Sequence, residues 1–174
     1  MVDFHAQVLA NTAWAFATLG QSDVKLFAAL GRAATWCVGD FNVQVLVNIA
    51  CAFATASSSD AQVFAALARA AELRMGDFYV QDLANTAWAF AKASQQDVQL
   101  RAEFSRVAEL RLGDLKALKP QKLLGAHVDP QVVAMLMWSS AQLQMLSKCL
   151  ANTILKETRA RLHEFSPCSL TSIV

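Results

Sequence analysis

Hydrophobic and polar positions follow one another along the chain with the spacing of amphipathic helices. Near the start, the apolar side chains fall on two neighbouring lines of a helix: Leu9, Ala13 and Phe16 on one, and Ala10, Trp14 and Ala17 on the next. This is the i, i+3, i+4, i+7 spacing of a helix with a broad buried face. After a short polar loop, a second helix has its own expected buried line: Leu26, Leu30 and Ala33, with Val63, Leu67 and Ala70 as their counterparts 37 residues later.

This helix pair repeats every 37 residues. The units follow in order: residues 4–40, 41–77 and 78–114, an insert at 115–127, a degenerate fourth unit at 128–164, and the start of a fifth at 165–174. Because a single helix pair cannot cover its own apolar faces, neighbouring pairs must stack. The sequence therefore predicts an all-α fold, a right-handed α-solenoid of 37-residue helix-turn-helix repeats, as one array over residues 1–174.

Particular residue types mark the ends of the predicted helices. The last residue of each polar loop is expected to cap the second helix: Asp23, Asp60 and Asp97. Glycines are expected to end that helix as left-handed caps: Gly39, Gly76 and Gly113. Neither end of the array has a polar capping unit, so we expect a piece of a longer array, or ends that self-associate or need a partner.

Composition removes several other classes of protein. The chain has 174 residues, of which 55% are hydrophobic, and this excludes a disordered protein. Six Gly and three Pro leave little turn chemistry for an all-β fold. Two uncharged stretches, 41–59 and 130–147, raise the question of membrane spans, but each carries several polar side chains, so we expect no membrane insertion. No targeting peptide is visible at residues 1–7.

The sequence contains no group of residues typical of a catalytic site. The three His are scattered, and the four Cys never form CxxC, which argues against a zinc cluster. No nucleophile and base pairing, phosphate-binding glycine loop or carboxylate pair occurs. We therefore expect a binding surface that needs neither a cofactor nor a metal, and not an enzyme.

The most specific signal is the motif F-x-x-Q-x-L-A-N-T-A-W-A-F-A at the start of each unit. Its positions in the three regular units are Gln7, Leu9, Asn11, Trp14 and Phe16; Gln44, Leu46, Asn48, Cys51 and Phe53; and Gln81, Leu83, Asn85, Trp88 and Phe90. The motif resembles the octotricopeptide and heptatricopeptide helical-repeat proteins, relatives of the FAST-kinase-like and RAP-domain proteins. It is also similar to the repeat domain of the trypanosome RNA-editing substrate-binding complex. The resemblance implies binding of single-stranded RNA in mitochondria, or alternatively in plastids, in support of RNA processing, stability or translation.

One amide recurs in register in the first helix of each unit: Asn11, Asn48 and Asn85. They lie in the less apolar arc of that helix, and Lys92 follows in the third unit. An amide carries donors and acceptors, so each Asn could meet the edge of one unstacked base. Alternatively, each Asn bonds the backbone or the Asn of the next unit and sets the stacking of the repeats. The Trp residues of the first helices, Trp14, Trp88 and Trp138, fall within the apolar arc instead and are expected in the core.

The cations are distributed along the chain in two groups that could contact phosphates. One group recurs in the second helix: Arg32, Arg69 and Arg106. The other gives the insert its charge: Lys116, Lys119 and Lys122. A phosphate-binding stripe is one interpretation of both groups. Surface ion pairs account for Arg69 and Arg106 equally well, since Glu72 and Glu109 follow them at i+3, and a solvated helix start accounts for the lysines.

The formal net charge is only +1, so any polyanion must be held by local patches. This leaves a second hypothesis open beside RNA binding. The chain could be a protein-interaction scaffold of the HEAT or armadillo kind, with an apolar groove for a protein partner. A continuous positive strip in the groove would favour RNA, and an exposed apolar patch would favour a protein partner.

Overall fold

The computed structural model describes residues 2–58, 60–93 and 98, and the separate positions 134, 135, 137–139, 141, 152 and 159. Its helices run in this order: α1 (Val2–Thr18), α2 (Val24–Cys37), the 3-10 helix η1 (Val38–Asp40), α3 (Val43–Thr55), α4 (Ala61–Arg74), the 3-10 helix η2 (Met75–Asp77) and α5 (Val80–Lys92). The described residues contain no strand, which confirms the all-α class. Over the same residues, no helix is both long and apolar enough to cross a bilayer.

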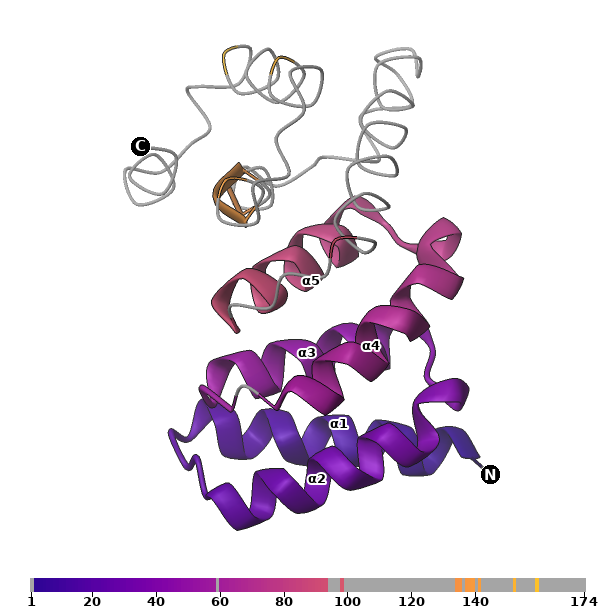
Figure 1. Cartoon of the computed structure of the whole chain (residues 1–174), viewed down its shortest axis with the longest axis vertical. Coiled ribbons are helices and arrows are strands. Elements are labelled where there is room, and N and C mark those ends of the chain that lie inside the picture. Colours follow the sequence, from indigo (N-terminus) through magenta and orange to yellow (C-terminus); the bar gives the residue numbers. More distant parts are fainter. Residues whose placement is uncertain are drawn as a thin grey trace.

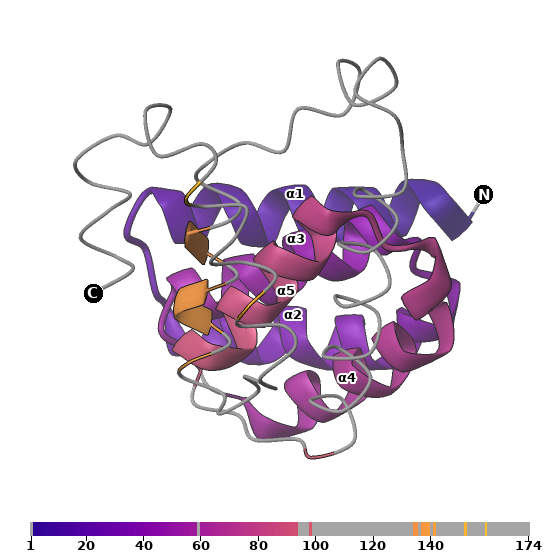
Figure 2. The ribbon, with the colours of Figure 1, turned by 90° about the horizontal axis from the view of Figure 1, so that it is seen from above.

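The described helices form two layers, and each of the first two 37-residue units contributes one helix to each layer. In the first layer α3 lies between α1 and α5 and contacts both; in the second layer α2 contacts α4. Figure 1 shows the pair α1 and α2 at the bottom, α3 and α4 above it, and α5 above them. Figure 2, from above, shows α4 to one side of α3 and α5. Within each layer the described helices therefore follow one another in chain order.

The predicted aspartate caps of the second helices are confirmed at Asp23 and Asp60. Asp23 Oδ1 accepts hydrogen bonds from the backbone N–H groups of Lys25 and Leu26 at 2.8 and 3.0 Å. Asp60 caps α4 in the same way, through the N–H groups of its second and third following residues. These bonds satisfy donors that have no partner within the helix. Asp97 lies outside the described residues.

The predicted left-handed caps at Gly39 and Gly76 are wrong. Both glycines lie inside the 3-10 helices η1 and η2, and neither has a positive φ. The last turn of each second helix tightens into a 3-10 turn instead, so that its backbone carbonyls accept hydrogen bonds within that turn. Left-handed residues end the first helices of the units, at Gly20 with φ 69° and Ser57 with φ 55°. Gly113 lies outside the described residues.

Aromatic pairs connect each second helix to the first helix of the following unit. The rings of Phe27 and Phe53 meet edge to face at 5.3 Å between centroids, and those of Phe64 and Phe90 at 5.2 Å. All four side chains are fully buried. Such pairs contribute about 0.5–1.5 kcal/mol beyond the burial of their surface. The same contact thus recurs at successive positions of the repeat.

The buried side of α2 differs from the predicted line by one residue. The prediction named Leu26, Leu30 and Ala33, but the buried residues of α2 are Phe27, Gly31 and Ala34. In α4 the matching prediction is confirmed, because Val63, Leu67 and Ala70 are buried. That side of α4 faces α2, whereas no described helix lies against the equivalent side of α2. Burial therefore depends on the neighbouring helix as well as on the pattern.

The contact between α2 and α4 is close at Gly31, and this predicts the effect of a small substitution. A Cβ added to Gly31 would lie 2.8 Å from Cγ2 of Val63, whose β-branched side chain has little rotamer freedom. Overpacking of this kind costs about 1–3 kcal/mol, more than the gain of about 0.8–1 kcal/mol in helix propensity. We expect Gly31→Ala to lower the free energy of unfolding by about 1 kcal/mol, as measured by urea denaturation.

The matched control is Gly39→Ala, because a Cβ at Gly39 meets no atom within 4 Å and its φ is not positive. This variant should be as stable as the parent chain or slightly more stable. Equal stabilisation by both substitutions would contradict the close packing of α2 on α4.

Candidate nucleic-acid interface

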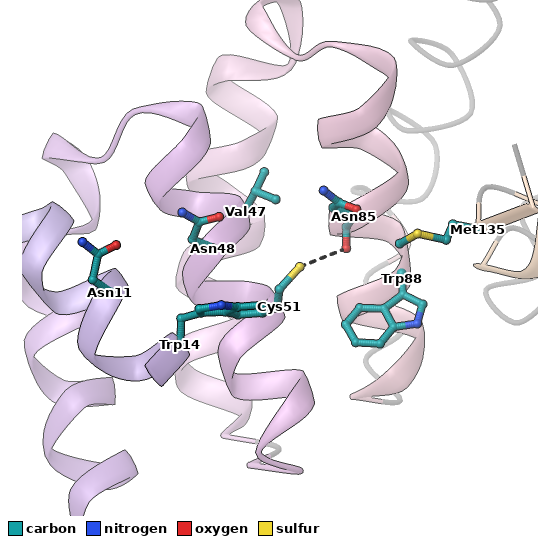
Figure 3. Close-up of a pocket in the computed structure, with 8 residues that line it drawn as sticks. All are labelled: Asn11, Trp14, Val47, Asn48, Cys51, Asn85, Trp88 and Met135. Atoms are coloured by element: carbon teal, nitrogen blue, oxygen red, sulfur yellow. Dashed lines mark hydrogen bonds between the residues drawn. The ribbon is translucent and has the colours of Figure 1, made fainter. Parts of the chain in front are cut away.

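The first helices of the units turn equivalent side chains toward one face of the α1, α3 and α5 layer. Figure 3 shows Asn11, Asn48 and Asn85 in a row, one from each helix. Each is followed three residues later by the side chain at the Trp position: Trp14, Cys51 and Trp88. Residues three apart lie on the same side of a helix. The face therefore carries an amide row and, beside it, an aromatic and sulfur row.

These two rows line one groove with a cavity volume of about 540 Å³. Its lining residues are Asn11, Trp14, Val47, Asn48, Cys51, Asn85, Trp88 and Met135. Met135 stands at the Asn position when the fourth unit is aligned with the others. A volume of several hundred cubic ångströms is typical of sites that bind small molecules or single groups of a polymer.

A second cavity of about 400 Å³ adjoins the groove, because it shares Val47, Asn48 and Asn85 with it. It is more polar, with Asp77 and Asp82 among its lining residues. Asn48 and Asn85 therefore lie where the apolar groove and the more polar, acidic cavity meet, whereas Asn11 lines the groove only.

The amides of the row are open to a ligand to different extents. Asn11 is exposed, and its Oδ1 accepts a hydrogen bond of 3.1 Å from Nε2 of Gln7. Asn48 and Asn85 are half-buried, and within the described part of the chain their amide groups make no hydrogen bond. The backbone carbonyl of Asn85 accepts from the Cys51 thiol at 3.6 Å. The three described Asn thus do not bond one another, and the amides of Asn48 and Asn85 keep their hydrogen-bonding capacity.

The prediction that the tryptophans belong to the core is wrong for Trp14, whose side chain is 46% exposed. Trp88 and Trp138 are half-buried. In α1 the buried line consists of small residues instead: Ala6, Ala10, Ala13 and Ala17. Alanines allow α1 and α3 to approach closely, and the apolar arc is wider than this contact. The larger Trp14 side chain is therefore left at the rim, where it lines the groove.

Cys51 takes the Trp position in the second unit and is buried. Burial raises the pKa of its thiol to about 12, so the thiol stays protonated at neutral pH. A protonated thiol is a poor nucleophile and a poor metal ligand. Among the described residues, no group of three or more His, Cys, Asp or Glu is placed to hold a metal.

The candidate cations divide between the two layers. The Nζ of Lys92 lies 4.8 Å from the centroid of the Trp88 ring, at the edge of the groove. Arg32 and Arg69 are exposed on α2 and α4, in the other layer, and neither lines the groove. The remaining predicted cations lie outside the described residues: Arg106, Lys116, Lys119 and Lys122. The described structure therefore brings the three Asn together with Trp88 and Lys92, and separates them from the two arginines.

The fold defines the class of the chain, an all-α protein of helical repeats, with a groove along its first helices. Comparison with protein families identifies the particular family. The model of the RNA-editing substrate-binding complex 6 protein matches residues 3–129, most of the chain, and the chain belongs to this family. The match includes the three regular units and the insert. A search of curated proteins gives no match.

Proposed function

We propose that the chain is a single-stranded RNA-binding subunit of a mitochondrial RNA-editing substrate-binding complex, and that it acts in RNA processing. The observation that carries this proposal is the row of Asn11, Asn48 and Asn85 on one open face. The family supports RNA and a multiprotein complex as its setting. The resemblance to octotricopeptide and heptatricopeptide proteins also supports two alternatives within this proposal. One is a role in RNA stability or translation, and the other is a location in plastids.

In this proposal the stacked helix pairs form a right-handed α-solenoid, and the RNA follows the layer of first helices. Each amide presents two donor hydrogens and an acceptor oxygen, which suit the Watson–Crick edge of one unstacked base. The spacing of one Asn per unit then sets one base per unit, as in other modular RNA-binding repeats. Binding and positioning of the RNA are the whole of the activity, without catalysis or a cofactor.

Few cations border the described groove, so phosphate contacts should be few. Arg32 and Arg69 lie on the other layer, and Arg106 occupies the same unit position, so the cations proposed to meet phosphates are Lys92, Lys116, Lys119 and Lys122. A strand that touches three or four of them should give a slope of about −2 to −3 in log K against log salt.

This slope tests the proposed function directly. The measurement is fluorescence anisotropy of a labelled single-stranded oligoribonucleotide with the full chain between about 30 and 200 mM KCl. The same oligonucleotide as a duplex should bind more weakly, because its base edges are paired. Equal affinity for the duplex, or a slope near zero, would contradict the proposal.

A protein-interaction scaffold is the second candidate function, and two observations favour it. The described groove has apolar and acidic lining residues and no continuous positive strip. Trp36 and Leu73 occupy the same position of successive units, on α2 and α4, and are 92% and 85% exposed. Exposed apolar side chains of this size are typical of contacts with another protein. This surface lies on the second layer, so protein binding there is compatible with RNA in the groove of the first layer.

A further inference from the structure

The indole rings of Trp14 and Trp88 both line the groove, and the partly buried Trp88 ring also packs against the core. Trp14 is 46% exposed, and Trp88 is half-buried with the Lys92 ammonium 4.8 Å from its ring centroid. Each ring comes three residues after an Asn of the row, on the same side of its helix. An apolar ring and an amide therefore lie next to each other twice along the groove.

We propose that Trp14 and Trp88 are stacking platforms for nucleobases. This inference rests on the proposed function and adds the groups that hold the faces of the bases. A nucleobase has an apolar face and a polar edge, and the groove offers an indole face beside an amide at both positions. Stacking on aromatic side chains tolerates every base, whereas hydrogen bonds to the edge discriminate among them. The Trp residues should thus supply affinity, and the Asn residues should supply sequence preference.

Cys51 breaks the series of platforms in the middle unit. Its thiol is buried and bonded to the Asn85 carbonyl, so it offers no ring to a base. The stacked bases should then be those opposite Asn11 and Asn85, two units apart. A base opposite Asn48 would be held by its edge alone.

Lys92 distinguishes the third unit from the first two. Its ammonium covers the Trp88 ring, whereas threonines occupy the equivalent positions, Thr18 and Thr55. The Thr18 hydroxyl donates to the Trp14 carbonyl at 2.9 Å and stays on its own helix. A base that stacks on Trp88 must displace the ammonium, which is then free to meet the neighbouring phosphate. Stacking and phosphate binding are coupled in this unit.

The test measures binding of oligo(A) and oligo(U) single strands to the full chain at low salt. Trp14→Leu and Trp88→Leu should each weaken binding about tenfold, because Leu keeps apolar volume but has no ring. Trp14→Phe and Trp88→Phe should retain most of the affinity. The matched control is Trp36→Leu, an exposed Trp on the other layer, which should leave the affinity unchanged.

Two further readouts separate stacking from a structural role. In a chain carrying Trp36→Phe and Trp138→Phe, the remaining Trp14 and Trp88 should lose fluorescence when RNA stacks on them. Lys92→Ala should lower the magnitude of the salt slope by about 0.7 while this quenching persists.

The outcomes distinguish the platforms from the proposed function. Two results would contradict the stacking role and leave the proposed RNA binding intact. One is equally tight RNA binding by Trp14→Leu, Trp88→Leu and Trp36→Leu, and the other is RNA binding without fluorescence quenching. If either Leu variant fails to fold by circular dichroism, the Phe variants and the quenching decide the question. Failure of the folded parent chain to bind any single strand at low salt overturns both proposals and favours the protein-interaction scaffold.

Discussion

Replacement of Phe53 by alanine should lower the free energy of unfolding by about 3–5 kcal/mol. The Phe53 ring is 1% exposed and packs edge to face on Phe27 across the boundary between two units. Its removal would leave a cavity where α2 meets α3. A loss of this size is a large share of the stability of a single domain. Urea denaturation followed by circular dichroism at 222 nm measures it.

Trp14→Ala is the variant with which the stability loss of Phe53→Ala is compared. The Trp14 side chain is larger than that of Phe53, but it is 46% exposed at the rim of the groove. We therefore expect Trp14→Ala to cost clearly less, about 1–2 kcal/mol. If Trp14→Ala lowers the free energy of unfolding as much as Phe53→Ala or more, Trp14 belongs to the core and does not line the groove.

Substitution of the whole Asn row should have the largest effect on RNA recognition. We expect the triple variant Asn11→Ala, Asn48→Ala and Asn85→Ala to lose about 2–4 kcal/mol of binding free energy for a preferred sequence, since three edge contacts disappear. Binding to unrelated sequences should change much less. The preferred sequence is first selected from a random single-stranded pool with the parent chain, and both affinities are then measured by anisotropy.

The control for the Asn row is the pair Arg32→Ala and Arg69→Ala. Both arginines are exposed on the second layer, so their removal should leave sequence preference unchanged and affinity nearly so. If the arginine pair abolishes binding while the Asn row can be replaced without effect, the second layer carries the RNA.

The repeat and the helix pairs could be predicted from the sequence because both depend on local, periodic signals. The 37-residue alignment needs no knowledge of contacts, and an Asp before an apolar run caps a helix wherever it occurs. Asp23 and Asp60 illustrate this. Asn42 was missed, although its side chain caps α3 by accepting from the N–H of Val45 at 2.9 Å. It occupies the same unit position as Tyr79, so the repeat itself does not mark it as a cap.

The position of Trp14 in the groove could not be predicted, because it depends on which part of a wide apolar arc faces the neighbouring helix. In α1 the alanines occupy the contact with α3, and this leaves Trp14 outside it. The periodic pattern includes both the alanines and Trp14, and it does not indicate which of them is more buried. The glycine caps failed for a related reason, since a helix can also end by tightening into a 3-10 turn, as at Gly39. The recurrence of Asn11, Asn48 and Asn85 at one unit position indicates that their side chains share a face, and Figure 3 shows them in a row.

Photo-crosslinking tests most directly whether the groove on the first layer is the RNA-binding face. A single-stranded oligoribonucleotide containing 4-thiouridine is bound to the full chain, irradiated, and the attached peptides are identified by mass spectrometry. We predict adducts on peptides of α1, α3 and α5, concentrated at Trp14 and Trp88 and reduced by excess unlabelled single strand. Adducts confined to α2 and α4, or no specific adducts at saturating RNA, would contradict the assignment of RNA binding to this groove.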